Sequence, residues 1–138
     1  MKEYFQISQA ERNQIKNRIT NILAQRPEIV FAYLHGSFLS APSFHDIDIA
    51  VFVDPHSVTL RDCLDYELTL SAQIRLPYAV DVRLLNNAPL GFQNNVARSG
   101  VLLFSRDDIQ LSNMLEQSSN YMIRNAYLIR ASLHELTA

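Results

Sequence analysis

Apolar residues recur along this chain with two periods, one helical and one alternating, and together they predict its elements. At helical spacing they predict a first helix that is capped by Ser8, with Glu11 reaching back to the cap, and that ends near Gln25. The other face of this helix carries cationic residues that we expect to be solvated. The apolar positions are Ile15, Ile19, Ile22 and Leu23, and the cationic positions are Arg12, Lys16 and Arg18.

The second predicted helix follows a turn at residues 54–57. Ser57 or Thr59 can cap this helix, and Leu76-Pro77 closes it. Its apolar positions recur at helical spacing and are expected to form the buried stripe: Leu60, Leu64, Leu68 and Ala72.

Two more helices are predicted in the C-terminal part of the chain. Pro89 suits the first turn of a short helix that contains Phe92 and Val96. Asp107 or Asp108 can cap a long final helix. The polar residues 118–120 predict a bend or break in the middle of that helix.

Apolar or alternating runs bounded by turn residues predict four strands, over residues 29–34, 46–53, 78–85 and 101–104. The first two runs are strongly apolar, which favours interior strands. The order of elements is α-β-turn-β-α-β-α-β-α. It indicates an α/β or α+β domain, with a mixed central sheet of about four strands flanked by helices and a long C-terminal helix.

Composition narrows the class of protein. The chain has 138 residues, 48% of them hydrophobic and 19% charged, so we expect a single globular domain over residues 1–138. A net charge of −2 without a basic tail does not favour nucleic-acid binding through phosphate neutralisation. The single cysteine, Cys63, excludes an internal disulfide and a cysteine-rich zinc site. A polar N-terminus and the lack of a long apolar run predict a cytoplasmic protein without a membrane span.

The candidate chemistry lies between residues 29 and 54. Asp46 and Asp48 are two residues apart in a predicted strand, so both point to the same face, away from the core. Gly36 permits a sharp turn and close approach of a ligand, and Ser37 offers a hydroxyl and a backbone amide where phosphate could bind. The pair of aspartates could instead be the solvent face of an edge strand. The apolar flanks argue against that reading, because unpaired charges are costly in interior strands.

A third carboxylate, Asp81, stands in the predicted strand 78–85. It would join the other two if that strand lies next to strand 46–53; otherwise it is a salt-bridged or edge-exposed aspartate. Three carboxylates offer only oxygen ligands, which suit two Mg2+ ions. One ion would orient a nucleoside triphosphate, and the other would lower the pKa of an attacking hydroxyl. No Gly-Lys-Ser/Thr loop is present, so a P-loop enzyme is excluded.

These residues resemble a known signature. Gly36-Ser37-Phe38, then Asp46-Ile47-Asp48-Ile49-Ala50-Val51, then Asp81 in a later strand look like the motif of the DNA polymerase β nucleotidyltransferase superfamily. The small size resembles its minimal branch, the MntA-type antitoxins that pair with HEPN-domain toxins. The stretch from Phe92 to Asp107 is similar to the region after the catalytic core of that branch. The loop from Phe38 to His45 is shorter than is usual in the family.

The resemblance implies a fold, an activity and a partner. It implies a nucleotidyltransferase fold and transfer of AMP from ATP to a tyrosine hydroxyl of a cognate HEPN ribonuclease toxin, which would be silenced. Gly36 and Ser37 would bind the triphosphate, and Asp46 and Asp48 would bind both metal ions. Asp81 would bind the catalytic ion and could act as base on the tyrosine hydroxyl.

Some roles and functions stay open on the sequence. Arg83 lies two residues after Asp81 and could touch phosphate or form a salt bridge that orients Asp81. His35 and His45 could each contact nucleotide or be structural. Two other functions compete with AMP transfer: an antitoxin that neutralises its partner by binding alone, and a nucleotidyltransferase of small molecules.

Overall fold

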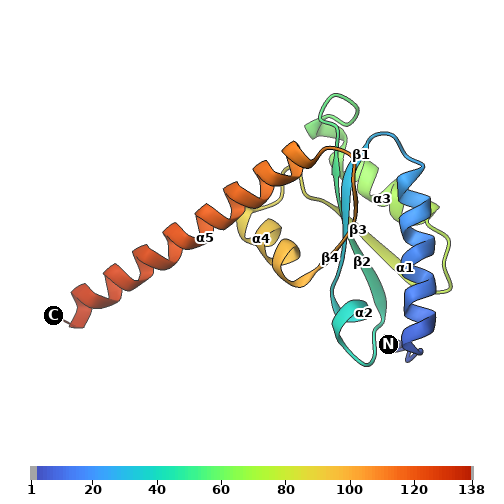
Figure 1. Cartoon of the computed structure of the whole chain (residues 1–138), viewed down its shortest axis with the longest axis horizontal. Helices are drawn as coiled ribbons and strands as arrows, with labels where there is room; N and C mark the ends of the chain where they lie inside the picture. The colour runs from blue at the N-terminus through green and yellow to red at the C-terminus, as the bar shows by residue number, and fades with distance from the viewer. Residues whose placement is uncertain (1–2, 138) are drawn as a thin grey trace.

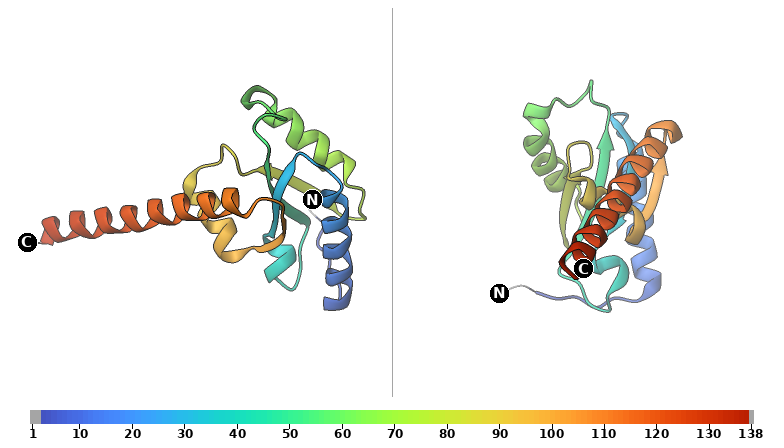
Figure 2. Two further views of the ribbon diagram at one scale, coloured as in Figure 1. Left: turned by 45° about the horizontal axis from the view of Figure 1, so that its top comes forward. Right: turned by 90° about the vertical axis from the view of Figure 1, so that its left-hand side faces the viewer.

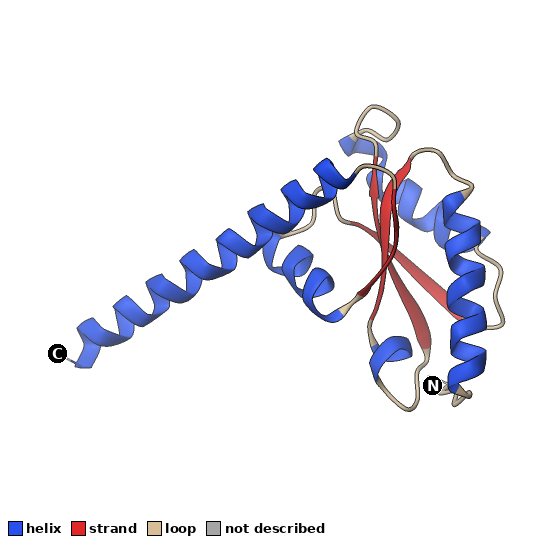
Figure 3. Cartoon of the chain, in the orientation of Figure 1, coloured by secondary structure: helices blue, strands red, loops and turns tan. Residues whose placement is uncertain are grey.

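The computed structural model describes residues 3–137, with side chains to residue 132. Its elements follow the predicted order, and the stretch predicted as a turn after the first strand contains a short helix, α2 (Figures 1 and 3). The elements are α1 Gln9–Ala24, β1 Ile29–His35, α2 Ser37–Ser40, β2 Asp46–Val53, a 3-10 turn η1 Leu60–Asp62, α3 Cys63–Gln73, β3 Ala79–Leu84, α4 Leu90–Ser99, β4 Val101–Ser105 and α5 Asp108–Thr137. The predicted fold class, a mixed sheet flanked by helices with a long C-terminal helix, is confirmed.

The four strands form one sheet in the order β3-β2-β1-β4. β1 pairs antiparallel with β2 and with β4, whereas β2 and β3 run parallel, so the sheet is mixed as predicted. β1 and β2 are the interior strands, which the apolar flanks of both runs had indicated. β3, which carries Asp81, is an edge strand beside β2.

Helices cover both faces of the sheet, α1 and α3 on one side and α4 with the start of α5 on the other (Figure 1). The α1/α3 side holds the larger core, in which Ile47, Ile49 and Val51 pack with Ile19 and Leu70. On the α4/α5 side a smaller core joins sheet residues to the two C-terminal helices; it includes Phe31, Tyr33, Ala50, Val96, Leu111 and Met114. Alternate residues of β2 therefore serve two different layers.

The predicted buried stripe of the second helix is wrong. Leu60, Leu64 and Leu68 are 74%, 65% and 62% exposed, whereas Leu70 is buried against the sheet. Polar side chains on the inner face of α3 explain this orientation. Glu67 Oε2 accepts a hydrogen bond from the Leu84 amide at 2.8 Å, and Ser71 Oγ accepts one from the Val82 amide at 3.0 Å. These bonds satisfy edge-strand donors and turn the leucines outward.

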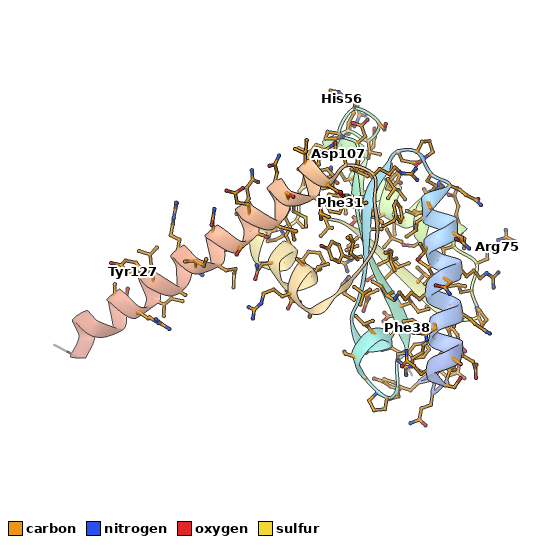
Figure 4. The ribbon with its side chains drawn as sticks, viewed as in Figure 1. Phe31, Phe38, His56, Arg75, Asp107 and Tyr127 are labelled. Carbon is orange, nitrogen blue, oxygen red and sulfur yellow. The ribbon has the colours of Figure 1, made fainter. Side chains whose placement is uncertain are left out.

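The expectation that Arg12 is solvated is also wrong. Its side chain is 8% exposed and donates hydrogen bonds to the carbonyls of Phe38 and Pro42, the latter at 2.7 Å. The guanidinium carbon lies 5.5 Å from the ring centroid of Phe38 and 5.2 Å from that of Phe44. Figure 4 shows Phe38 beside α1. Arg12 thus fastens α1 to the segment between β1 and β2.

The predicted bend in the last helix is absent, because α5 is a single helix from Asp108 to Thr137. Ser118 is fully buried, and its hydroxyl donates to the Leu115 carbonyl at 3.3 Å, so this polar side chain is satisfied within the helix. Asp107 accepts hydrogen bonds from the amides of Ile109 and Gln110, which confirms the predicted cap. The later turns of α5 project away from the sheet (Figure 2), and Tyr127, labelled in Figure 4, lies on this projecting part. Within residues 3–137, no helix is both long and apolar enough to cross a bilayer.

Candidate active site

The turn after β1 brings Gly36 against β2, the strand that carries Asp46 and Asp48. Gly36 has φ 82° and ψ −165°, a conformation that side chains disfavour, and it precedes the first residue of α2, Ser37. A Cβ atom at Gly36 would overlap the Asp48 Oδ2 atom and would lie 3.1 Å from Asp48 Cγ. The sequence placed a glycine here for a sharp turn, and the structure adds a second requirement, the contact with Asp48.

The three predicted acids share one face of the sheet. Asp48 of β2 is paired in register with Asp81 of the parallel strand β3, and with His35 of β1 on its other side. Asp46 lies two residues before Asp48 and points the same way. This face is the one on which Ala50 packs with α4 and α5. The structure therefore brings Asp46, Asp48 and Asp81 to one side, at the end of the sheet face beyond the α4/α5 core.

The acids repel one another. Burial, and next the nearby charges of Asp46 and Asp81, together raise the pKa of Asp48 to about 6. The two outer acids face basic neighbours. His45 Nε2 lies 3.5 Å from Asp46 Oδ2, and Arg83 Nε lies 3.4 Å from Asp81 Oδ1. Asp48 lies between the other two acids, beside Asp81 on the neighbouring strand and two residues from Asp46.

Arg83 and His35 complete the surroundings of the acids. Arg83 is exposed, points to the same face as Asp81 and forms the ion pair that was one of its two predicted roles. His35 is half-buried with its ring centroid 5.8 Å from that of Phe92, edge to face. Burial lowers the pKa of His35, and its Nε2 atom has no hydrogen-bond partner among the described residues. A neutral imidazole thus sits beside the central acid.

The donor set of this face suits a hard divalent cation. Carboxylate oxygens are the ligands Mg2+ prefers, and such an ion would relieve the repulsion from Asp46 and Asp81 that, after burial, helps to raise the pKa of Asp48. As the side chains of residues 3–132 stand, no three His, Cys, Asp or Glu groups converge tightly enough to form a ready-made metal centre. The two outer acids instead turn to His45 and Arg83. Rotation of those side chains is what a bound cation would require.

Residues 17–109, most of the chain, match the family described as Polymerase beta, Nucleotidyltransferase. The chain belongs to this nucleotidyltransferase family. The resemblance inferred from Gly36-Ser37 and the acidic motif is therefore confirmed at the level of the family. A comparison of this nucleotidyltransferase with curated proteins finds no match.

Solved structures give the same fold for this nucleotidyltransferase. A chain of the complex of a tri-AMPylated Shewanella oneidensis HEPN toxin with its MNT antitoxin aligns over 92% of this chain and 99% of its own, with 19% identity and a TM-score of 0.61. A toxin–antitoxin structure with AMP-PNP aligns over 89% and 98%, with 20% identity and a TM-score of 0.62. An MntA–HepT toxin–antitoxin complex aligns over 91% and 99%, with 19% identity and a TM-score of 0.60.

Proposed function

We propose that this nucleotidyltransferase is the antitoxin of a HEPN toxin pair and transfers AMP from ATP to a tyrosine hydroxyl of its cognate HEPN ribonuclease. Family membership supports the reaction class. The shared fold with antitoxin complexes, one containing a tri-AMPylated HEPN toxin and one containing AMP-PNP, supports the partner and the nucleotide. The observation that carries the proposal is the pairing of Asp48, which lies against Gly36, with Asp81, and the position of Asp46 on the same face.

Each residue of the site has a role in the proposed reaction. The backbone of Gly36 and the hydroxyl and amide of Ser37 hold the β- and γ-phosphates of ATP. Asp46 and Asp48 would hold the metal ions that bind the triphosphate, and Asp81 would accept the proton of the attacking hydroxyl, directly or through water. Arg83 offers its guanidinium to phosphate while it keeps Asp81 oriented.

The chemistry is a displacement at phosphorus. The tyrosine oxygen forms a bond to the α-phosphorus, the bond from that phosphorus to the bridging oxygen breaks, and pyrophosphate leaves. Asp46, Asp48 and Asp81 would hold two Mg2+ ions, which when bound neutralise the phosphates and favour the ionised hydroxyl. The site has no other carboxylates on this face from which to build such a set within β2 and β3.

A labelled-nucleotide assay tests the proposal. The chain is incubated with ATP labelled on the α-phosphate, Mg2+ and its proposed partner, a cognate HEPN-domain protein. We expect label on the HEPN protein. A HEPN variant without tyrosine should not be labelled, and restoring a tyrosine in that variant should restore labelling. Asp46→Asn and Asp48→Asn should each abolish labelling.

The same variants separate the competing functions. If both keep full inhibition of the toxin while labelling is absent even in the wild type, the chain neutralises its partner by binding alone. If the wild type labels small hydroxylated molecules and leaves the HEPN protein unlabelled, it is a nucleotidyltransferase of small molecules. Either result would overturn the proposed function.

A further inference from the structure

A pocket of about 510 Å3 lies at the outer edge of the sheet, past strand β3. One wall comes from η1 and the start of α3, and the other comes from the turn before α4 and from α4 itself. Its lining includes Leu60, Arg61, Leu64, Arg83, Asn87 and Phe92. Arg83 belongs to both places, because it lines the pocket and pairs with Asp81 at 3.4 Å. Arg83 therefore links the pocket to the acidic face.

The geometry of the proposed displacement at phosphorus suggests a role for the β3 edge of the sheet. In-line displacement puts the attacking and the leaving oxygen on opposite sides of the phosphorus. The proposed phosphate-binding turn, Gly36-Ser37, follows β1, and the sheet order places β2 and then β3 beyond it. If pyrophosphate leaves on the β1 side and the phosphorus lies over β2, the attacking hydroxyl must arrive from the β3 side. That is the side on which the pocket lies.

We propose that this pocket, called the β3-edge pocket below, binds the tyrosine-bearing segment of the protein acceptor. This assignment rests on the proposed function. It identifies the surface with which the enzyme would select its protein acceptor. Leu60, Leu64 and Phe92 present apolar and aromatic surface to an aromatic side chain and its apolar neighbours. Two residues of extended strand, about 7 Å, separate Asp81 from Arg83, so a phenol held at the pocket mouth reaches the acids.

Charge at the pocket favours an acceptor with a carboxylate near its tyrosine. Arg61 and Arg83 both line the pocket. The acidic residue among the lining side chains, Glu67, already accepts a hydrogen bond from the Leu84 amide. The lining therefore carries two cationic side chains and one carboxylate, and an acidic residue beside the acceptor tyrosine complements the excess of positive charge.

The exposed leucines of α3 supply a matched pair of variants. Leu64 lines the pocket, whereas Leu68, one helical turn later, is equally exposed but is not among the lining residues. Leu64→Gln and Leu68→Gln make the same chemical change on the same helix and keep good helix formers. Neither residue belongs to the acidic face, so binding of Mg2+ and AMP-PNP should be unchanged in both.

The test measures kcat/KM for labelling of the HEPN protein, the affinity for that protein, and the affinity for AMP-PNP with Mg2+. We expect Leu64→Gln to lower kcat/KM by about tenfold or more, as loss of a central apolar contact does, and Leu68→Gln to stay within about twofold of the wild type. Equal rates in all three proteins, or equal losses in both variants, would overturn the assignment. Weaker AMP-PNP binding in Leu64→Gln alone would assign the pocket to the nucleoside and also overturn it.

If the proposed function is wrong, these measurements give a different set of results. If the wild type transfers no label, AMP transfer is refuted for every variant, and the affinity for the HEPN protein then tests the pocket. Weaker binding confined to Leu64→Gln would retain the pocket as the partner's site, whereas unchanged binding would refute that as well.

Discussion

Replacing Asp48 by asparagine should stabilise the fold while removing the proposed activity. In the folded protein, burial and the neighbouring acids Asp46 and Asp81 raise the pKa of Asp48 from 3.8 to about 6. A shift of that size corresponds to about 3 kcal/mol of unfavourable ionisation at neutral pH. Because Asp48 is half-buried and solvent screens its charge, we take about half, roughly 1.5 kcal/mol. For a chain of this length that is a rise in Tm of about 5 °C.

The sign and pH range of this effect follow from linkage. A carboxyl group whose pKa is higher in the folded state loses stability as pH rises from its unfolded pKa to its folded pKa. The difference in Tm between Asp48→Asn and the wild type should therefore be small near pH 4, grow up to about pH 6, and stay constant above it. Thermal unfolding across that range, without divalent cations, measures the difference directly.

Two further measurements make the prediction refutable. Glu116→Gln, a change of an exposed acid on α5, serves as control and should show no such growth with pH. Added Mg2+ should raise the Tm of the wild type more than that of Asp48→Asn, because the ion binds the folded state through this carboxylate. An Asp48→Asn protein that is less stable than the wild type at pH 7.5, or a difference that does not vary with pH, would refute the reasoning.

Three other substitutions test separate parts of the structure. Gly36→Ala should cost about 1–3 kcal/mol through its positive φ and, by displacing the Asp48 carboxylate, abolish labelling; normal Tm and labelling would contradict this. Arg12→Met should lower stability to denaturant by about 2–4 kcal/mol, since it leaves two carbonyls without their charged donor, while the exposed Arg18→Met should be nearly neutral. Arg83→Gln should change stability by under about 0.5 kcal/mol yet lower the labelling rate; an unchanged rate would remove Arg83 from the site.

Much of the fold could be predicted from the sequence because apolar and polar residues alternate along a strand, and this alternation shows which side chains face the core. The alternation in residues 46–53 predicted which side chains of β2 enter the core, and Ile47, Ile49 and Val51 are there. The pairing of Asp48 with Asp81 was predicted only as a condition, since no local pattern determines which strands are neighbours. Strand order depends on long-range packing, which a single sequence does not display.

The helices were harder to orient than the strands. Leu60, Leu64 and Leu68 have helical spacing, but α3 turns Glu67 and Ser71 to the sheet because the edge amides of β3 need acceptors. The burial of Arg12 was missed for a related reason. Its partners are backbone carbonyls of the segment between β1 and β2, 26 and 30 residues away in the chain, and such acceptors leave no mark on the pattern of side chains.

The hydrogen bonds from β3 to α3 also restrict how another protein can approach this molecule. An exposed edge strand ordinarily invites a foreign strand to extend the sheet, which is a common route to both peptide capture and aggregation. Here the amides of Val82 and Leu84 are already occupied by Ser71 and Glu67. Backbone-mediated sheet extension is thereby blocked along this margin, so recognition at β3 must proceed through side chains and can be selective for sequence.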